Sequence, residues 1–191
     1  DEHIPAIINA WYPGEQGGTA VADVLFGDYN PAGRLPLTYY KSLDELPAFD
    51  DYDITKGRTY KYFKGDVLYP FGYGLSYSSF KYSDLKVKDG ANTVSVSFRL
   101  KNTGKRKGDE VAQVYVRIPG TGGVVPIKEL KGFRRIPLKS GESRVVEIEL
   151  DKEQLRYWDA GLGRFIVPQG AFDIMVGASS KDIRLQTVIN L

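Results

Sequence analysis

Residues 94–100 read Val-Ser-Val-Ser-Phe-Arg-Leu and residues 112–118 read Ala-Gln-Val-Tyr-Val-Arg-Ile, so apolar and polar side chains alternate in both stretches. Successive side chains of a β-strand point to opposite faces of its sheet, and strict alternation therefore indicates a strand with one buried face. Residues 146–150 and 172–176 repeat the pattern later in the chain. The second half of the sequence is thus predicted to be built from strands.

Turn signals separate these strands. They are Asp89-Gly90, Asn102-Thr103-Gly104, Lys139-Ser140-Gly141 and Pro168-Gln169-Gly170. About seven short strands in a stretch of this length are typical of a two-sheet, immunoglobulin-like β-sandwich. We expect this sandwich to occupy residues 79–191.

Residues 1–38 have a different pattern, typical of the end of an α/β domain. Residues 4–11 are short and apolar, like a buried strand, and Thr19 is placed to cap a following helix. That helix carries an apolar stripe (Ala20, Val21, Val24 and Leu25) and is expected to end at Gly27. One strand and one helix cannot bury each other's apolar faces, so we expect the rest of this layer to lie upstream.

Residues 39–78 show neither helix nor strand periodicity for most of their length, and they are rich in aromatic side chains. This pattern indicates a linker packed on its neighbours. Two roles are open for these aromatic rings. Buried, each would remove about 150–250 Å² from water and so join the linker to the domains on either side. Exposed, they could stack on sugar rings. We favour the packing role.

The composition excludes several classes of function. The 191 residues contain no cysteine and one histidine, His3, so disulfides, cysteine-ligated metals, thiol nucleophiles and histidine triads are not expected. No apolar run approaches the roughly 18 residues that a membrane helix needs. The only methionine is Met175, so we expect the chain to be a processed or excised piece of a longer protein.

Charge is distributed unevenly along the chain. The formal net charge is +2, but residues 1–78 carry −5 and residues 79–191 carry +7. The tightest basic group consists of Lys101, Lys105, Arg106 and Lys107. Because the other basic residues are spread along strands, we interpret this group as a solvated turn and expect no nucleic-acid or membrane partner.

Four blocks of sequence together resemble family 3 glycoside hydrolases. They are Trp11-Tyr12-Pro13-Gly14-Glu15-Gln16-Gly17-Gly18, Ala22-Asp23-Val24-Leu25-Phe26-Gly27-Asp28, Asn30-Pro31-Ala32-Gly33-Arg34-Leu35-Pro36 and Tyr69-Pro70-Phe71-Gly72-Tyr73-Gly74-Leu75-Ser76-Tyr77. The similarity continues through Leu155-Arg156-Tyr157-Trp158-Asp159, so it covers essentially the whole chain.

The resemblance implies a mainly β chain. It would comprise the end of an α/β sandwich domain (1–38), an aromatic linker (39–78) and a fibronectin type III-like β-sandwich (79–191). The family's nucleophile and acid/base motifs have no counterpart here, so no catalytic residue is carried over, and no substrate-binding residue is assigned. The implied partners are upstream catalytic domains of the same parent enzyme and the oligosaccharide substrate of that parent. A periplasmic or secreted location is favoured over a cytoplasmic one, and no cofactor is expected.

The carboxylates that remain have structural and functional interpretations. A retaining glycosidase needs two carboxyl groups about 5–5.5 Å apart. Glu15, before the expected helix, is the best single candidate, but we favour helix capping over catalysis or support of an upstream site. Asp50, Asp51 and Asp53 could ligate Ca²⁺, although their spacing fits no known loop, and we expect no metal site. Residues 120–123, Gly-Thr-Gly-Gly, resemble part of a phosphate loop but lack the Lys-Ser/Thr that would follow, and are interpreted as a plain loop.

Two functions follow. In the first, the chain is the non-catalytic C-terminal portion of an exo-acting β-glycosidase that removes terminal β-linked xylose or glucose, and it stabilises the catalytic domains. In the second, the sandwich is an autonomous carbohydrate-binding or adhesion module. Phe49-Asp50-Asp51-Tyr52 and Gly57-Arg58-Thr59-Tyr60-Lys61-Tyr62-Phe63 look more like the β-xylosidase branch than the β-glucosidases. We also expect residues 79–191 to fold alone and residues 1–38 to need a partner.

Overall fold

The computed structural model describes residues 3–119, 124–159 and 161–191, and it is mainly β. The N-terminal part contains helix α1 (Gly17–Phe26), strand β1 (Tyr39–Tyr40), helix α2 (Thr59–Tyr62) and strand β2 (Val67–Tyr69). The sandwich strands are β3 (Phe80–Asp89), β4 (Thr93–Asn102), β5 (Gly108–Arg117), β6 (Glu129–Leu138), β7 (Ser143–Asp151), β10 (Ala171–Gly177) and β11 (Ile183–Asn190). A small hairpin of β8 (Tyr157–Asp159) and β9 (Arg164–Ile166) lies between β7 and β10.

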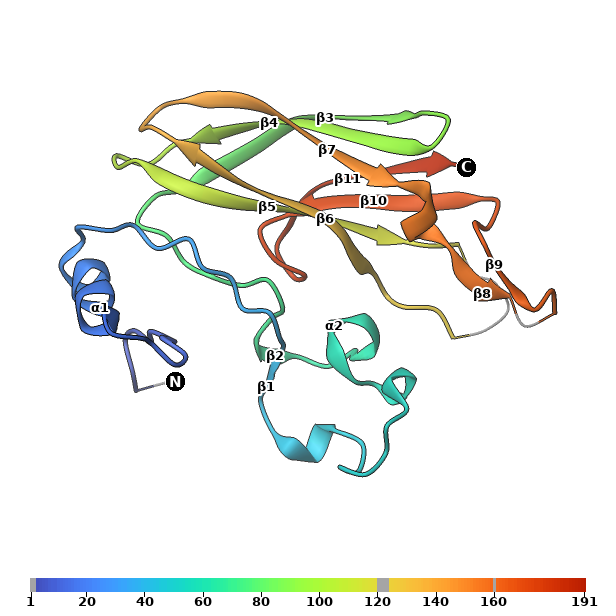
Figure 1. The fold of residues 1–191 in the computed structure, drawn as a ribbon, viewed down its shortest axis with the longest axis horizontal. Coiled ribbons are helices and arrows are strands. Elements are labelled where there is room, and N and C mark those ends of the chain that lie inside the picture. Colours follow the sequence, from blue (N-terminus) through green and yellow to red (C-terminus); the bar gives the residue numbers. More distant parts are fainter. Residues whose placement is uncertain (1–2, 120–123, 160) are drawn as a thin grey trace.

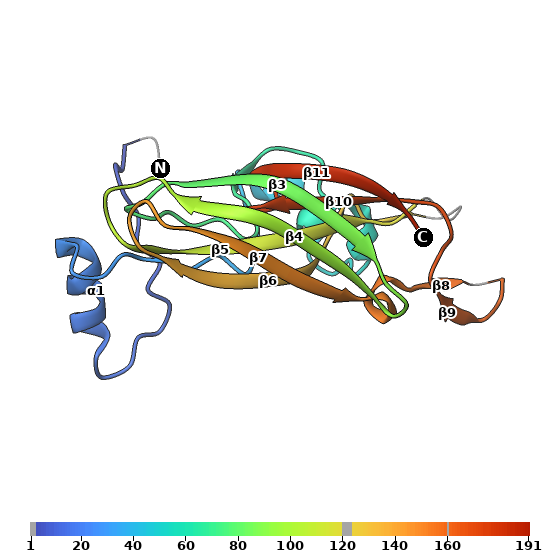
Figure 2. The same ribbon diagram turned by 90° about the horizontal axis from the view of Figure 1, so that it is seen from above.

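Two antiparallel sheets form the sandwich, which confirms the predicted fold class. One sheet has the strand order β3-β4-β7 and the other the order β11-β10-β5-β6. In Figure 1 the three-stranded sheet lies above the four-stranded one, and the view from above shows the strands of the two layers running roughly along the same axis (Figure 2). Seven long strands in this order give the topology of a fibronectin type III-like domain.

The core lies between the two sheets and consists of the side chains that the alternation assigned to the buried face. Val94, Val96, Phe98 and Leu100 of β4 are at most 1% exposed. They meet inward-facing residues of the other sheet, among them Val114, Val116, Phe172, Ile174 and Val176. Each buried side chain of this size stabilises the fold by about 1.5–3 kcal/mol relative to its exposed state.

The predicted turns fall between strands or next to them. Residues 90–92, 103–107 and 139–142 connect successive sandwich strands, and residues 168–170 lead into β10. The Gly170 amide donates to the Leu191 carbonyl, and the Gly170 carbonyl accepts from the Leu191 amide, which fixes the end of the chain against this turn.

The N-terminal segment departs from the prediction. Residues 4–11 form no strand, and Ile4, Ile7 and Trp11 are more than half exposed. The expected strand was wrong because nothing in the described chain offers this segment a sheet edge to pair with. Helix α1 forms and ends as expected, with Gly27 in the left-handed conformation at φ 82°.

The predicted N-cap of α1 is also wrong. The helix begins at Gly17 after Gln16, without a side-chain capping bond, so Thr19 lies inside the first turn. The helix projects beyond one end of the sandwich (Figure 2), and its apolar residues Leu25 and Phe26 are 63% and 83% exposed.

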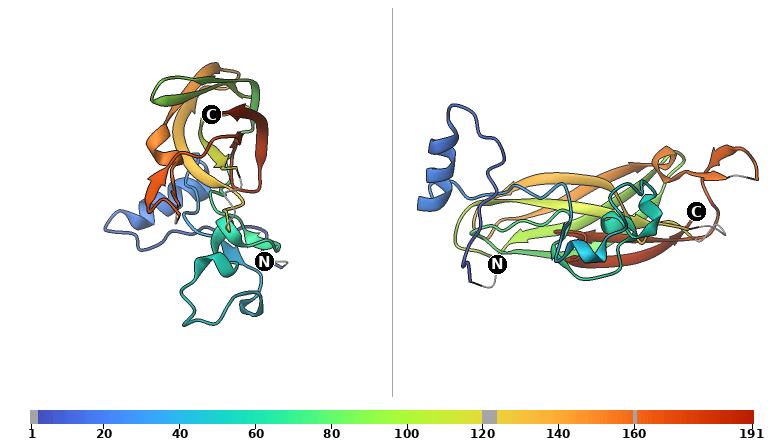
Figure 3. Two further views of the ribbon diagram at one scale, coloured as in Figure 1. Left: turned by 90° about the vertical axis from the view of Figure 1, so that its right-hand side faces the viewer. Right: turned by 90° about the horizontal axis from the view of Figure 1, so that it is seen from below.

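The linker runs back along the outer face of the four-stranded sheet (Figure 3, right). Short β1 and β2 pair with each other, and three-residue 3-10 turns at Leu43–Glu45 and Ile54–Lys56 complete its regular structure. The Leu35 amide donates to the Tyr73 carbonyl and the Gly72 amide to the Leu35 carbonyl, which ties the segment just before the linker to the C-terminal part of the linker.

Candidate functional site

A network of buried polar contacts lies where the linker meets strand β5. On the outer face of β5, Gln113 and Tyr115 are 2% and 0% exposed, although both occupy the polar phase of the alternation. The ring of Tyr60 in α2 stacks on Phe71 at 4.3 Å and meets Tyr115 edge-on at 5.9 Å. The linker therefore buries a sheet face that would otherwise be in water.

Gln113 joins three parts of the chain. Its Nε2 donates to the carbonyl of Gly72 in the linker at 3.0 Å and to the carbonyl of Ala178, after β10, at 2.7 Å. Its Oε1 accepts from the Tyr115 hydroxyl at 2.5 Å. Burial raises the pKa of Tyr115, so this hydroxyl remains a donor. An amide with both of its ends bonded in a buried site fixes the position of the linker on the sheet.

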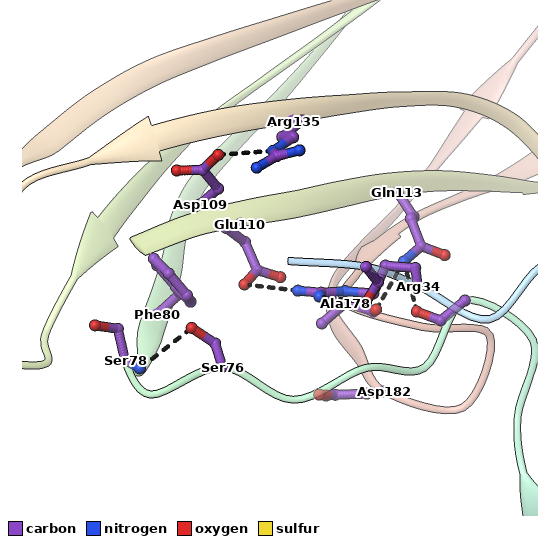
Figure 4. A network of polar contacts seen from close by, with 12 residues as sticks. Arg34, Ser76, Ser78, Phe80, Asp109, Glu110, Gln113, Arg135, Ala178 and Asp182 are labelled. Carbon is purple, nitrogen blue, oxygen red and sulfur yellow. Dashed lines mark hydrogen bonds and ion pairs between the residues drawn. The ribbon is translucent and has the colours of Figure 1, made fainter. Parts of the chain in front are cut away.

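A buried ion pair holds the segment that leads into the linker. Arg34 Nη2 donates to Glu110 Oε2 at 3.3 Å (Figure 4). The Tyr82 hydroxyl donates to Glu110 Oε1 at 2.9 Å. The side chains of Arg34 and Glu110 are only 9% and 4% exposed. Burial raises the pKa of Glu110 above its ordinary value of 4.5, while the Arg34 charge and the Tyr82 hydrogen bond act in the opposite direction.

Two further contacts anchor the C-terminal end of α1. Asn30 accepts from Ser76 Oγ and from the Tyr77 amide, and it donates to the Lys107 carbonyl at 2.9 Å. Arg106 donates to the Gly27 carbonyl at 3.0 Å and lies over the Tyr77 ring. The basic group around residues 101–107 is exposed as predicted, but Arg106 uses the turn to dock the helix end.

Helix α2 is tied to β6. The Tyr60 hydroxyl accepts from the Leu130 amide at 3.0 Å, and Lys61 Nζ donates to Glu129 Oε1 at 2.5 Å. Glu129 also pairs with Lys131 at 2.9 Å. These two cations hold the pKa of Glu129 below its ordinary value despite the opposing effect of burial.

Glu15 does not perform the capping role that the sequence favoured. It is exposed, makes no hydrogen bond or ion pair within the described chain, and lies before a helix whose first turn contains no acidic residue. The capping interpretation is wrong because the residue that precedes the helix is Gln16.

Asp51 and Asp53 are occupied by a local turn. Asp51 accepts from the Asp53 amide and from Lys56 Nζ at 2.7 Å, and Asp53 accepts from the amide and the hydroxyl of Thr55. The hydrogen bond from Lys56 is the main reason why the pKa of Asp51 is lowered. Within the described ranges, no three acidic or histidine side chains gather to hold a metal ion.

The remaining sequence candidates divide by exposure. Tyr39 packs on Tyr69, and Tyr40 on Phe63, as the packing role requires. In contrast, Phe49 and Tyr52 are 94% and 87% exposed. These two aromatic rings therefore do not pack the linker against the neighbouring domains. The Gly120–Gly123 stretch lies outside the described residues. None of the helices described is long and apolar enough to cross a membrane.

The sequence interpretation missed Arg34, Glu110 and Gln113. A signal for Glu110 was present, because it continues the inward phase of Ala112, Val114 and Val116 and so had to be a carboxylate directed at the core. No signal in the sequence pairs it with Arg34, which lies 76 positions earlier.

The fold and this junction define a class of protein: a fibronectin type III-like sandwich bound through buried polar contacts to the chain that precedes it. Residues 1–77 match the glycosyl hydrolase family 3 C-terminal domain, and residues 110–180 match the fibronectin type III-like domain. The chain is therefore similar to the C-terminal region of family 3 glycoside hydrolases.

Similar proteins agree with this assignment. Over 98% of its length the chain is 46% identical to the xylan 1,4-beta-xylosidase of Xylanibacter ruminicola, and over 96% it is 37% identical to the periplasmic beta-glucosidase of Salmonella typhimurium. The solved structure of beta-glucosidase 3B from Thermotoga neapolitana in complex with glucose superposes with a TM-score of 0.86 at 36% identity over 94% of the chain. The chain spans 22%, 26% and 27% of these three proteins, about a quarter of each.

Proposed function

We propose that this chain is the non-catalytic C-terminal portion of an exo-acting β-glycosidase and that it stabilises the catalytic domains of that enzyme. The parent would remove terminal β-linked xylose or glucose from plant-type oligosaccharides. Its partners are the upstream catalytic domains and, through them, the oligosaccharide. Nucleic acid and membrane are not among the proposed partners.

One observation carries the proposal. A single continuous segment is fixed to the sandwich at its C-terminal side, through Arg34 and Gln113, and presents unpaired apolar side chains at its N-terminal side. Ile4, Ile7 and Trp11 are 57%, 56% and 54% exposed. Exposed apolar residues clustered in one segment are typical of a surface that another domain covers. The junction would thereby transmit the rigidity of the sandwich to that domain.

A β-xylosidase parent is favoured over a β-glucosidase. The chain is 46% and 41% identical to two β-xylosidases, against 37% for the Salmonella typhimurium beta-glucosidase. The linker stretches 49–52 and 57–63 point to the same branch. We therefore propose xylose as the terminal sugar.

The test is a chimera in which this chain replaces the stretch that it matches in the Xylanibacter ruminicola enzyme. We expect the chimera to hydrolyse p-nitrophenyl β-D-xyloside and the enzyme truncated before that stretch to be inactive or insoluble. Ile7→Asp should reduce the yield of active chimera, because it puts a charge on the surface to be covered. Val145→Asp, at a similarly exposed apolar position of β7, is the matched control and should not.

The proposal fails if the folded chimera is inactive, or if the two aspartate variants behave alike. It also requires that the 191-residue chain alone releases no p-nitrophenol. Turnover that disappears in Glu15→Gln would contradict it, since that carboxylate would then be catalytic.

A carbohydrate-binding module remains the second candidate, because the β8–β9 hairpin exposes two aromatic rings side by side. Trp158 and Phe165 are 55% and 59% exposed and meet edge-to-face at 5.2 Å. Retention of the chain on insoluble xylan that is lost in Trp158→Ala would favour this function.

A further inference from the structure

A pocket of about 340 Å³ opens where the linker, the segment before β6 and the turn after β10 meet. It is lined by the rings of Tyr60 and Phe63, by Thr38, and by the side chains of three lysines, Lys64, Lys128 and Lys181. A volume of this order accommodates a small molecule of monosaccharide size. The pocket does not overlap the Arg34–Glu110 junction.

The charge of the pocket is positive and uncompensated. Lys64, Lys128 and Lys181 form no ion pair with a described residue, and Lys128 Nζ donates to the Ser180 carbonyl at 2.7 Å. Burial and the neighbouring charge of Lys181 lower the pKa of Lys128, and no carboxylate offsets them.

Asp66, two residues after Lys64, pairs with Lys41 at 3.9 Å, and the acidic groups next to Lys128 and Lys181 are also engaged elsewhere. Glu129 binds Lys61 and Lys131, and Asp182 binds Arg184 through both carboxylate oxygens. An anion that enters the pocket would therefore meet ammonium groups that form no ion pair with a described carboxylate.

The walls of the pocket are prearranged for a ring-shaped ligand with polar edges. Tyr60 is held by its stack on Phe71, and Phe63 is held edge-on by Tyr40 at 4.9 Å. Thr38 has a buried hydroxyl oxygen without a hydrogen-bond partner among the described residues. A buried polar atom left unbonded is costly, and a shift of the Thr38 side chain toward the pocket would let a ligand hydroxyl satisfy it.

We propose that this pocket binds a carboxylate-bearing saccharide, a uronic acid, with its ring against Tyr60 and Phe63 and its carboxylate at the lysines. The choice of a sugar as the ligand rests on the proposed function, whereas the choice of an acidic sugar follows from the positive charge of the pocket. Binding here involves no bond cleavage. The site would hold an acidic branch or end of a polysaccharide on the non-catalytic part of the enzyme.

The 191-residue chain is titrated with D-glucuronate, D-glucose and acetate at low ionic strength and followed by amide NMR. Glucuronate should bind saturably, at least about tenfold tighter than either glucose or acetate, because only glucuronate offers both a ring and a charge. Shifts should centre on residues 60–64 and 127–128. Acetate binding as tight as glucuronate would reveal a simple anion site, and equal binding of glucose would remove the role of charge. Either result overturns the proposal, as does absence of saturable binding.

Variants locate the site. Lys128→Met should weaken glucuronate binding about tenfold, and Lys181→Gln by a smaller factor because that lysine is exposed. Lys105→Gln, in the exposed β4–β5 turn, is the matched control and should leave binding unchanged. Unaltered binding in both Lys128→Met and Lys181→Gln refutes the assignment. Failure here would leave the activity of the chimera untouched, so this inference and the proposed function can fail separately.

Discussion

The buried pair of Arg34 and Glu110 predicts how firmly the linker is held. In Arg34→Met the Glu110 carboxylate loses its cation but stays buried in the closed state, with only the Tyr82 hydrogen bond. Removing one partner of a buried pair costs about 3–5 kcal/mol, because an uncompensated charge remains. Opening of the linker returns that charge to water, so the cost appears as a lower free energy of linker opening.

The assay is amide hydrogen exchange at Leu35 and Gly72, whose N–H groups join the segment before the linker to the C-terminal part of the linker. A loss of about 3 kcal/mol corresponds to a fall in protection factor of roughly a hundredfold. Arg99→Met is the matched control, since Arg99 bonds Asp84 at 2.9 Å but both side chains are at least half exposed. That change should leave both protection factors nearly unaltered.

The effect of Arg34→Met depends on pH in a defined direction. The pKa of Glu110 in the closed state is raised above 4.5 by burial, so the closed state binds the proton more tightly than the open one. The contribution of Glu110 protonation to the stability of the closed linker is fully present below pH 4.5, and it is lost as pH rises through the raised closed-state pKa. Loss of the Arg34 charge raises the pKa of Glu110 further. The free energy of linker opening in Arg34→Met should therefore fall further below that of the unaltered chain as pH rises from mildly acidic to neutral. A deficit that is constant or shrinks as pH rises would refute the buried-charge explanation.

The other predictions concern the linker and the N-terminal segment. Gly72→Ala should destabilise linker closure by about 1–3 kcal/mol more than Gly141→Ala. Both glycines have positive φ, but only a Cβ at Gly72 would collide with the side-chain oxygen of Gln113. Urea unfolding and hydrogen exchange measure the difference. In limited proteolysis with mass spectrometry, cuts should appear first in residues 4–16, and resistance of that segment equal to that of the sandwich in a monomeric sample would contradict this. The chain should release no product from aryl β-xylosides or β-glucosides in a chromogenic assay.

The sandwich was predictable because its sequence carries the period of a strand. The inward phase of residues 94–100 and 112–118 depends only on the pleat, and these residues are buried as the alternation indicates. Helix α1 was predictable at its end, where Gly27 provides a left-handed residue, and less so at its start, where no capping side chain marks the boundary.

The junction was not predictable, because its partners are distant in sequence and its residue types are ambiguous. Gln113 and Tyr115 alternate with apolar residues and lie on the face of β5 opposite the core, and the alternation alone does not indicate that the linker covers them. Periodicity reports which side of a strand a residue occupies and not what lies on that side. The strand expected at residues 4–11 failed for a related reason: apolar sequence forms a strand only where a neighbouring edge exists.

The side-chain amide of Gln113 bonds both the linker and the sandwich, and this affects which domain boundaries suit a truncated or transplanted form of the protein. A sandwich excised at the start of β3 would bring Tyr115 and Gln113 to its surface and leave Glu110 without Arg34, which invites aggregation through the newly bared face of β5. The portable module is therefore larger than the strands suggest, and a graft onto another scaffold should begin before Asn30, so that the linker travels with the sheet it covers.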